Sequence, residues 1–393
     1  MANVSSSNGL EKRPKLRFPG FDEPYKQCRI GDIYAERSQR GASDMELLSV
    51  TMNDGVMPRS EIEGKDNSSE DKSNYKVVLM GDMVYNSMRM WQGANGISPC
   101  DGIVSPAYTV LMPKIPISNG YFAAFFKSPN LINEFRKNSQ GMTSDTWNLK
   151  YPQIETIKVC IPALAEQNRV ADMLGTLERR IAKQAQLVEN LKKYKRGVVA
   201  AILSHQIKFS DATGNPYPEW TSCTLQDAVD FLDGQRKPLE SADRAKRQGQ
   251  YPYYGASGII DYIDDFIFDE PLLLLGEDGA NILNRSTPLC FIAEGKYWVN
   301  NHAHAMRPKA GQNIKFLCEL LESLDYTRYN TGTAQPKLNQ EKCRRIELAL
   351  PVYEEQCRIA DFLSAIDQRT DKAKNILDYL RSNRDGLLQQ LFI

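Results

Sequence analysis

The sequence has few of the residues that metal sites and disulfide frameworks require. It contains three histidines, and its eight cysteines are scattered without a CxxC pair. A zinc site or a disulfide network is therefore not expected, and a reducing cytoplasm is the natural compartment. No apolar run approaches the roughly 20 residues of a membrane helix, the longest tight one being Leu272–Leu275. The N-terminal segment also lacks the apolar region of a signal peptide.

The sequence has no excess of charge of either sign. Lys plus Arg and Asp plus Glu both number 49 among 393 residues, so the formal net charge is zero. This excludes a uniformly basic nucleic-acid coat, although a local basic groove remains open. Hydrophobic residues make up 41%, which is ordinary for a folded protein. The length indicates two or three domains.

The motifs of common catalytic and cofactor sites are missing as well. There is no GxxxxGK[ST] loop for ATP, and GANG (93–96) and GASG (255–258) lack the GxGxxG spacing. NPYP (215–218) superficially resembles the NPPY motif of amino-methyltransferases, but its second proline is misplaced and we interpret it as a turn. His302 and His304 could both ligate a metal, yet no third ligand stands at a typical spacing. A surface-contact or structural role is favoured for them, and the chain is expected to be non-catalytic.

What the sequence does contain is an internal repeat. A shift of 189 residues places IPALAEQNRVADML (161–174) on LPVYEEQCRIADFL (350–363), with identical Pro, Gln, Arg and Ala-Asp positions. A shift of 195 aligns the upstream segments, setting Val104 on Val299. Between these anchors the two copies differ strongly. A framework kept twice with different residues attached to it predicts two related ligands that are read separately.

Each copy ends in a stretch with the pattern of a long helix. Apolar residues recur at alternating steps of four and three over 170–202 and again over 359–391, and Lys195 and Arg384 interrupt both seams at the same position. This heptad pattern is typical of helices that wrap around each other. Residues 165–203 alone would form a helix of about 58 Å, which an ordinary amphipathic core helix does not explain. We therefore expect the helices to pair and to space two globular segments.

The expected fold class is mixed α/β (α+β), because short β-like runs alternate with helical stretches such as 120–137 and 314–324. Two tandem repeated domains are separated by two long helices that pair as an antiparallel coiled coil. The predicted boundaries are a disordered tail at residues 1–13, a first domain at 14–163, a central helix at 164–205, a second domain at 206–352 and a C-terminal helix at 353–393.

Polar and aromatic loops in both domains have the composition of a nucleic-acid interface. Arg, Asn and Gln pair with guanine and adenine edges, while Lys, Ser and Thr hold phosphates. A solvated surface is the plain alternative for any single residue, but the duplication favours binding for the loops together. The residues predicted to contact DNA are Arg89, Trp91, Gln92, Asn95, Ser144 and Trp147 in the first domain, and Arg236, Lys237, Tyr253, Tyr254, Ser257, His302, His304 and Gln335 in the second.

These features resemble the specificity subunit of type I restriction-modification systems over essentially the whole chain. The resemblance is carried by two P-x4-Q-x-R-x-A-D-x-L signatures (162–174 and 351–363) and by YPYYGASGII (251–260), WVNNHAHAM (298–306) and TGTAQPKLN (331–339). The first domain departs from this pattern, because GMTSDTWNLK stands where the second has TGTAQPKLN. Its contact residues are therefore harder to transfer.

The resemblance implies recognition of an asymmetric bipartite site in double-stranded DNA, one half per domain, with the helices setting the gap. It also implies two methylation subunits as partners, which bring S-adenosylmethionine, and restriction subunits that use ATP and Mg. No cofactor is then expected on this chain, and no membrane is involved. One rival is a non-catalytic coiled-coil scaffold with two protein-binding domains, which leaves the divergent loops unexplained. Another is a self-contained methyltransferase, for which the chain has no cofactor loop.

Overall fold

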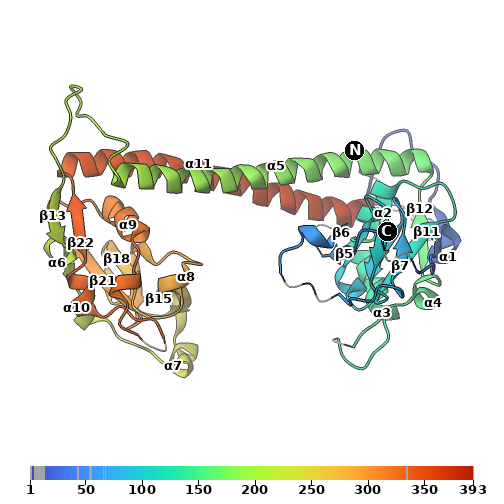
Figure 1. The fold of residues 1–393 in the computed structure, drawn as a ribbon, viewed down its shortest axis with the longest axis horizontal. Coiled ribbons are helices and arrows are strands. Elements are labelled where there is room, and N and C mark those ends of the chain that lie inside the picture. The colour runs from blue at the N-terminus through green and yellow to red at the C-terminus, as the bar shows by residue number, and fades with distance from the viewer. Residues whose placement is uncertain are drawn as a thin grey trace. The chain divides into compact units, whose positions relative to one another are not determined.

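The computed structural model divides the chain into two compact units (Figure 1). Unit 1 comprises residues 1–186 and 374–393, and unit 2 comprises residues 187–373. Each unit therefore contains a globular part together with a portion of both long helices. The residues that the structure describes are 2–3, 14–41, 44–52, 55–64, 66, 68–144, 146–332 and 335–392. The tail predicted at 1–13 lies outside them, except for the two residues of β1 (Ala2–Asn3), which pairs with β2 (Leu16–Arg17).

The globular part of unit 1 is built on an antiparallel four-stranded sheet in the order β4-β11-β8-β9. Its strands are β4 (Tyr34–Glu36), β8 (Met83–Asn86), β9 (Asn95–Ile97) and β11 (Tyr108–Pro113). Further pairs are β3 (Lys26–Arg29) with β12 (Lys158–Ile161), β5 (Leu48–Thr51) with β6 (Gly55–Pro58), and β7 (Lys76–Val78) with β10 (Gly102–Val104). The short helices are α1 (Ile30–Ile33), α2 (Asn119–Phe125), α3 (Pro129–Asn138), α4 (Tyr151–Ile154), η1 (Arg59–Glu61) and η2 (Met90–Gln92).

Unit 2 contains two four-stranded sheets and one two-stranded pair. The first sheet has the order β14 (Val229–Phe231), β21 (Ala303–Pro308), β18 (Leu272–Gly276), β19 (Cys290–Ala293). The second has the order β16 (Gly258–Ile263), β15 (Gln248–Gly255), β20 (Lys296–Val299), β17 (Phe268–Asp269). The pair is β13 (Thr221–Thr224) with β22 (Glu347–Leu350). The short helices are α6 (Leu225–Ala228), α7 (Ser241–Lys246), α8 (Asn281–Asn284), α9 (Ile314–Ser323), α10 (Gln340–Arg344), η3 (Asp233–Gln235) and η4 (Thr327–Tyr329).

The two units repeat one framework element by element. The shift of 195 places β3, α1, β4 and β11 on β13, α6, β14 and β21 with the same first and last positions. The shift of 189 places β12 on β22 in the same way. The sheet orders β4-β11-β8-β9 and β14-β21-β18-β19 also correspond. The predicted mixed α/β fold with a tandem repeat is therefore confirmed.

The prediction of one continuous helix over 120–137 is wrong. The stretch predicted at 120–137 is two helices, because α2 ends at Phe125 and α3 begins at Pro129. The Ser128 side chain accepts a hydrogen bond from the N–H of Leu131 at 3.4 Å and so caps α3. Proline lacks a backbone N–H and is favoured in the first turn of a helix, where that group would have no partner. The helix expected at 314–324 agrees with α9.

The two long helices are α5 (Leu164–Leu203) and α11 (Tyr353–Leu391), of 40 and 39 residues. In unit 1, Leu174 of α5 lies in one apolar cluster with Leu391, while Glu178 lies 3.7 Å from Arg384. In unit 2, Ile202 lies in one apolar cluster with Ile359. Within each unit the portions of α5 and α11 run antiparallel, as the heptad pattern predicts.

The repeated signature attaches each long helix to its own unit through a buried glutamine. The Gln167 side chain accepts from the N–H of Ser118, just before α2, at 3.0 Å and donates to the Pro162 carbonyl at 3.0 Å. Its equivalent Gln356 accepts from the N–H of Asn313, just before α9, at 2.9 Å and donates to its own signature proline at 2.9 Å. A buried amide whose bonds are satisfied on both sides thus joins the start of each long helix to the segment before α2 or α9.

Candidate nucleic-acid interface

The predicted contact residues lie partly in loops next to strand ends, whereas Asn95, Tyr253, Tyr254 and His304 lie on strands. In unit 2 the loop before α10 is bound to the end of β18, because the N–H of Leu338 donates to the Glu277 carbonyl at 2.7 Å. In unit 1 the N–H of Leu149 donates to the Ser87 carbonyl at 2.8 Å. Leu149 and Leu338 are related by the shift of 189. The framework therefore holds corresponding loops together in both units.

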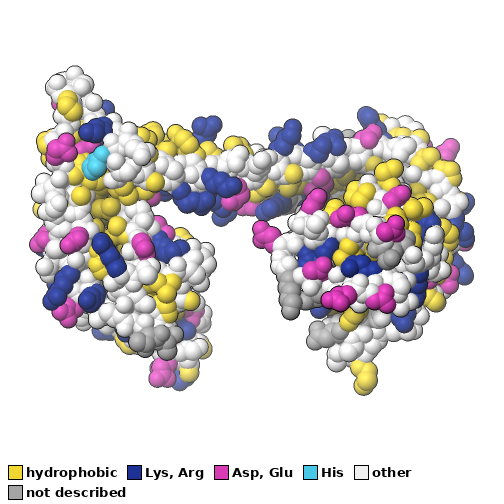
Figure 2. Space-filling model, viewed as in Figure 1, with side chains coloured by type: hydrophobic (Ala, Val, Ile, Leu, Met, Phe, Trp, Pro, Cys, Tyr) yellow, Lys and Arg dark blue, Asp and Glu magenta, His cyan; other side chains and the backbone are white. Residues whose placement is uncertain are grey.

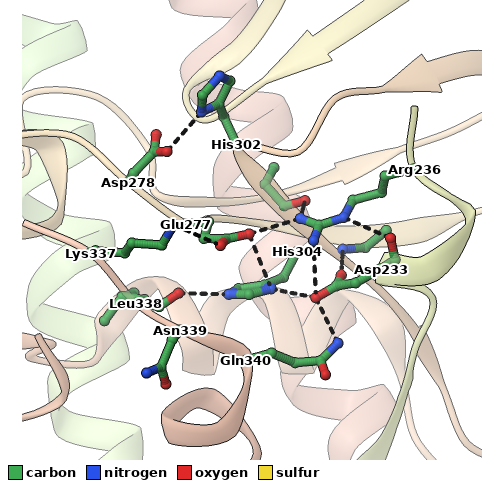
Figure 3. Close-up of polar contacts among 12 residues, drawn as sticks. Asp233, Arg236, Glu277, Asp278, His302, His304, Lys337, Leu338, Asn339 and Gln340 are labelled. Atoms are coloured by element: carbon green, nitrogen blue, oxygen red, sulfur yellow. Dashed lines mark hydrogen bonds and ion pairs between the residues drawn. The ribbon is translucent and has the colours of Figure 1, made fainter. Parts of the chain in front are cut away.

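A buried histidine organises these loops in unit 2 (Figure 3). The Nδ1 atom of His304 lies 2.7 Å from the Asp233 carboxylate, and its Nε2 atom lies 2.8 Å from the Leu338 carbonyl. Both partners can only accept, so both ring nitrogens carry protons and the ring is charged. Burial opposes this charge, but the hydrogen bond to Asp233, together with Cys343, raises the pKa of His304 to about 10.

The network continues through charged side chains to the neighbouring segments. Arg236 donates through Nη1 to Glu277 at 2.9 Å and to the Ala303 carbonyl at 2.6 Å. Lys337 lies 3.4 Å from Glu277, and Gln340 donates to Asp233 at 2.8 Å. These contacts join η3, the end of β18 and the loop before α10 into one rigid group of segments.

Opposing effects act on the carboxylate at the centre of this network. Burial would raise the pKa of Asp233, but His304 and Arg236 outweigh it, so that the pKa of Asp233 is lowered. Asp233 and His304 are therefore both charged near neutral pH.

Around this network, several polar side chains of unit 2 are exposed. The His302 side chain is 50% exposed and lies 2.7 Å from the Asp278 carboxylate. The Lys337 side chain is 51% exposed. Lys237, Ser257 and Gln335 are also exposed. These groups are placed to donate to phosphates or base edges.

Three predicted contact residues are instead buried and hydrogen-bonded within the protein. Asn95 donates to the Phe126 carbonyl at 3.3 Å, and the Tyr253 hydroxyl accepts from the N–H of Leu239 at 2.9 Å. His304 is the third. We interpret all three as residues that position the loops. Tyr254 is half-buried and stacks on Phe291 at 5.8 Å, and the Arg236 side chain is only 12% exposed.

In unit 1 the structure brings together two tryptophans predicted from separate loops. The rings of Trp91 and Trp147 meet edge to face with centroids 5.1 Å apart, and the Arg136 guanidinium lies over the Trp147 ring at 5.5 Å. Arg89 and Ser144 are exposed, and Gln92 is half-buried on η2. Edge-to-face and cation–π contacts of this kind fix ring positions at a partly exposed surface.

The same place in the framework therefore holds different chemistry in the two units. The shift of 195 places Thr109 of β11 on His304 of β21. In unit 1 the Thr109 hydroxyl lies 2.9 Å from the Ser87 hydroxyl, both side chains being buried. A neutral pair of hydroxyls thus occupies the position where unit 2 has a charged network.

Two further arginines of unit 2, Arg244 and Arg247, are paired with acidic side chains. Arg244 lies 3.0 Å from Asp261, and Arg247 lies 2.9 Å from Asp264. These arginines brace the β15–β16 hairpin. The sequence did not single out Asp233, Glu277 or Lys337, although Lys337 stands inside TGTAQPKLN (331–339). Their role depends on pairing across the fold, which spacing along the chain does not reveal.

Apolar grooves lie on the long helices in both units, and Figure 2 shows apolar and basic side chains exposed along these helices. The groove in unit 1 has a volume of about 700 Å³ and the groove in unit 2 about 420 Å³. Their linings correspond under the shift of 189: Leu177 with Ile366, Arg180 with Arg369, and Leu191 with Leu380.

The part of the chain that the structure describes offers neither a metal site nor a membrane-spanning helix. No group of three or more His, Cys, Asp or Glu residues there could hold a metal ion. None of the helices in that part combines the length and the apolar character that crossing a membrane requires.

Comparison with known proteins agrees with the sequence signatures. The family model of the type I restriction modification DNA specificity domain matches residues 217–381. A putative type I restriction enzyme specificity subunit of Haemophilus influenzae is 31% identical over 155 residues, which are 39% of this chain and 38% of that protein. The EcoprrI type I specificity subunit of Escherichia coli is 24% identical over 214 residues, 51% of this chain and 52% of that protein. The chain thus matches about half or less of the length of these curated relatives.

Among solved structures, the type I restriction-modification S subunit from M. genitalium has the same fold. It aligns with a TM-score of 0.60 and 16% identity, over 97% of this chain and 99% of that one. The predicted resemblance to type I specificity subunits and the predicted fold are both confirmed.

Proposed function

We propose that this chain is the non-catalytic DNA-specificity subunit of a type I restriction-modification complex. Each unit reads one half of an asymmetric bipartite site in double-stranded DNA. The observation that carries the proposal is the duplicated framework with different chemistry at the same loop ends, Ser87 with Thr109 in unit 1 and Glu277 with His304 in unit 2. One framework used twice presents its loops equivalently, while different side chains select different bases.

We infer that the long helices set the gap between the half-sites and bind two methylation subunits. The apolar grooves on α5 and α11 support this, because equivalent residues line them in both units and each suits one copy of a partner. S-adenosylmethionine would then enter with the methylation subunits, and ATP with Mg would enter with the restriction subunits. This chain would supply recognition alone.

The direct test is DNA binding by the chain together with its methylation partner. Selection from a pool of random duplexes, read out by gel shift, should enrich a split sequence. Isotope-labelled methyl transfer should require the partner and should be absent with this chain alone. Co-purification of the proteins without enrichment of any sequence would favour the protein-binding scaffold, and methyl transfer by the isolated chain would favour an enzyme.

A further inference from the structure

Unit 1 exposes apolar side chains in two loops that contact each other. Met88 is 45% exposed and Met142 is 99% exposed. Trp91 and Trp147 are partly exposed in the same two loops. We refer to Met88, Trp91, Met142 and Trp147 as the Met–Trp surface. Its two loops are held together by the Trp91–Trp147 contact and by the hydrogen bond from Leu149 to Ser87.

The loop that carries Met142 is held by several internal contacts. Its ends are joined by two backbone hydrogen bonds between Gln140 and Asn148, at 2.9 and 2.8 Å. Gly141 has φ +144°, and a side chain there would meet the Thr146 carbonyl oxygen at 2.6 Å, so only glycine fits. In Figure 1 the loop projects from unit 1 between α3 and α4. The backbone of the loop is thus restrained, whereas the fully exposed Met142 side chain still has to be ordered when a ligand binds.

Unit 2 is polar in the loop that corresponds to the Met142 loop. Gln335 and Lys337 are exposed in it, and the network beneath it is charged. The position of Met88 stays apolar in unit 2, because the shift of 195 places it on Leu283, which is 46% exposed. Hydrogen-bonding groups discriminate bases by their donors and acceptors, whereas apolar groups in the major groove contact the C5-methyl group of thymine. The two units therefore have the means to read two different features of base pairs.

Cationic groups around the Met–Trp surface favour DNA as its occupant. Arg89 and Lys150 are exposed next to it, and Arg136 lies over Trp147. Cations at the edge of an apolar centre suit a groove bordered by phosphates. An apolar protein partner would not require this border.

From this geometry we propose that unit 1 recognises thymine methyl groups in its half-site through the Met–Trp surface, with Met142 as the central contact. Unit 2 reads its half-site by hydrogen bonds. This inference rests on the proposed function, because it assigns a chemical preference to one of the two half-sites.

Uracil substitution tests the proposal, since uracil pairs like thymine but lacks the C5-methyl group. The complex of the chain with its methylation partner is titrated with duplexes carrying uracil in one half-site at a time. Uracil at the contacted thymine of the unit 1 half-site should weaken binding about fourfold per methyl group. Uracil in the unit 2 half-site should change it less than twofold.

The Met142→Ala variant connects this preference to the loop. It should lose about as much affinity for thymine duplexes as uracil substitution causes, and it should no longer distinguish uracil from thymine. Met80→Ala is the matched control, because Met80 is 72% exposed and precedes β8 at the end opposite the Met88 loop. That variant should bind like the unchanged chain.

The inference can fail while the proposed function stands. Unchanged binding with uracil at every thymine of the unit 1 half-site, equal effects of uracil in both halves, or equal behaviour of Met142→Ala and Met80→Ala would each overturn it. Loss of the methylation partner from Met142→Ala, with DNA preference unchanged, would also overturn it by assigning the surface to a protein. Failure of the proposed function appears differently, as the absence of any enriched motif.

Discussion

At the scale of single residues, the two units differ in charge at the position of Thr109 and His304. The hydroxyl pair in unit 1 needs no counter-charge, whereas the His304 ring requires Asp233 and the Leu338 carbonyl to satisfy both of its protons. The ring thereby links the loop before α10 to the sheet. We infer that it acts on recognition only indirectly, through the placement of His302 and Lys337.

Replacing His304 by glutamine should destabilise unit 2 by roughly 1–3 kcal/mol, because the buried Asp233 loses one of its two charged partners and keeps only Arg236, 3.4 Å away. It should also weaken recognition of the unit 2 half-site only. Thermal unfolding and binding to duplexes altered in one half-site measure the two effects. His302→Gln is the control, since that side chain is half exposed and its loss should leave stability nearly unchanged. Equal weakening of both half-sites would contradict the assignment.

The same residue predicts a pH dependence of stability. The pKa of His304 is raised to about 10 in the folded state, above the ordinary value of 6.5. Its contribution is therefore fully present below about pH 6.5 and declines as the pH rises towards 10. The midpoint of thermal unfolding of unit 2 should fall over this range. In His304→Gln the midpoint of thermal unfolding should fall less between pH 6.5 and 10. If the variant showed the same fall as the unchanged chain, the His304 ring would not be charged.

The sequence predicts surface residues better than it predicts buried polar ones. Trp91 and Trp147 were expected in contact loops and are found side by side. Asn95 and His304 were expected to contact DNA by their residue type, yet they are buried. Whether an amide or imidazole points outward depends on the strand register, which brings Asp233 to His304 from 71 residues away.

At the scale of elements, the basic interruptions in the two helical seams have a structural reason. Lys195 lies 2.8 Å from Asp367 in unit 2, and Arg384 lies 3.7 Å from Glu178 in unit 1. The shift of 189 converts one pair into the other. A single charged pair within an apolar seam restricts the register of two helices at some cost in stability.

The two pairs should differ in strength. Lys195 also lies 2.6 Å from Glu319, and its side chain is only 22% exposed. Lys195→Met should therefore cost about 1–3 kcal/mol, since it leaves Glu319 partly buried without its cation. Arg384→Met should cost about 0–1 kcal/mol, because its partner is largely exposed. Chemical denaturation of both variants gives the comparison, and a larger loss for Arg384→Met would contradict this account.

Helices and strands were largely predictable where the sequence has a strong periodic pattern, such as the heptads or the internal repeat. The heptad pattern predicted both long helices, and the internal repeat predicted that the two domains correspond. The break between α2 and α3 was missed, although Ser128 and Pro129 signal it locally. The anchoring role of Gln167 and Gln356 could not be read from the sequence, because their partners stand more than 40 residues away.

At the scale of the whole molecule, unit 1 is built from both ends of the described chain. The Phe392 ring lies 5.3 Å from both Tyr121 and Phe125, within the apolar cluster of α2. The core of unit 1 therefore includes the end of α11. Linear domain boundaries do not capture this arrangement, because a segment far away in sequence completes the core.

Phe392→Ala should therefore destabilise unit 1 by about 3–5 kcal/mol, the usual cost of removing a buried phenylalanine. Hydrogen exchange of α2 should rise, while exchange in unit 2 should stay as it was. Tyr379→Ala, at an exposed position of the same helix, is the control and should leave α2 unchanged. Protection of α2 that persists in Phe392→Ala would show that its core closes without α11.

Exchange of a whole recognition segment tests the independence of the two units. Residues 206–352 are replaced by the corresponding segment of another specificity subunit, leaving both long helices and unit 1 intact. The recognised sequence should change in one half only, with the other half and the gap retained. A change in both halves would mean that the units do not read DNA separately.

The most direct measurement is a methylome. The chain is expressed with its methylation partner in an unmethylated host, and modified adenines are mapped by single-molecule sequencing. The account predicts one split, asymmetric motif with a gap of fixed length. Methylation at a continuous motif, or no methylation although the proteins co-purify, would contradict it.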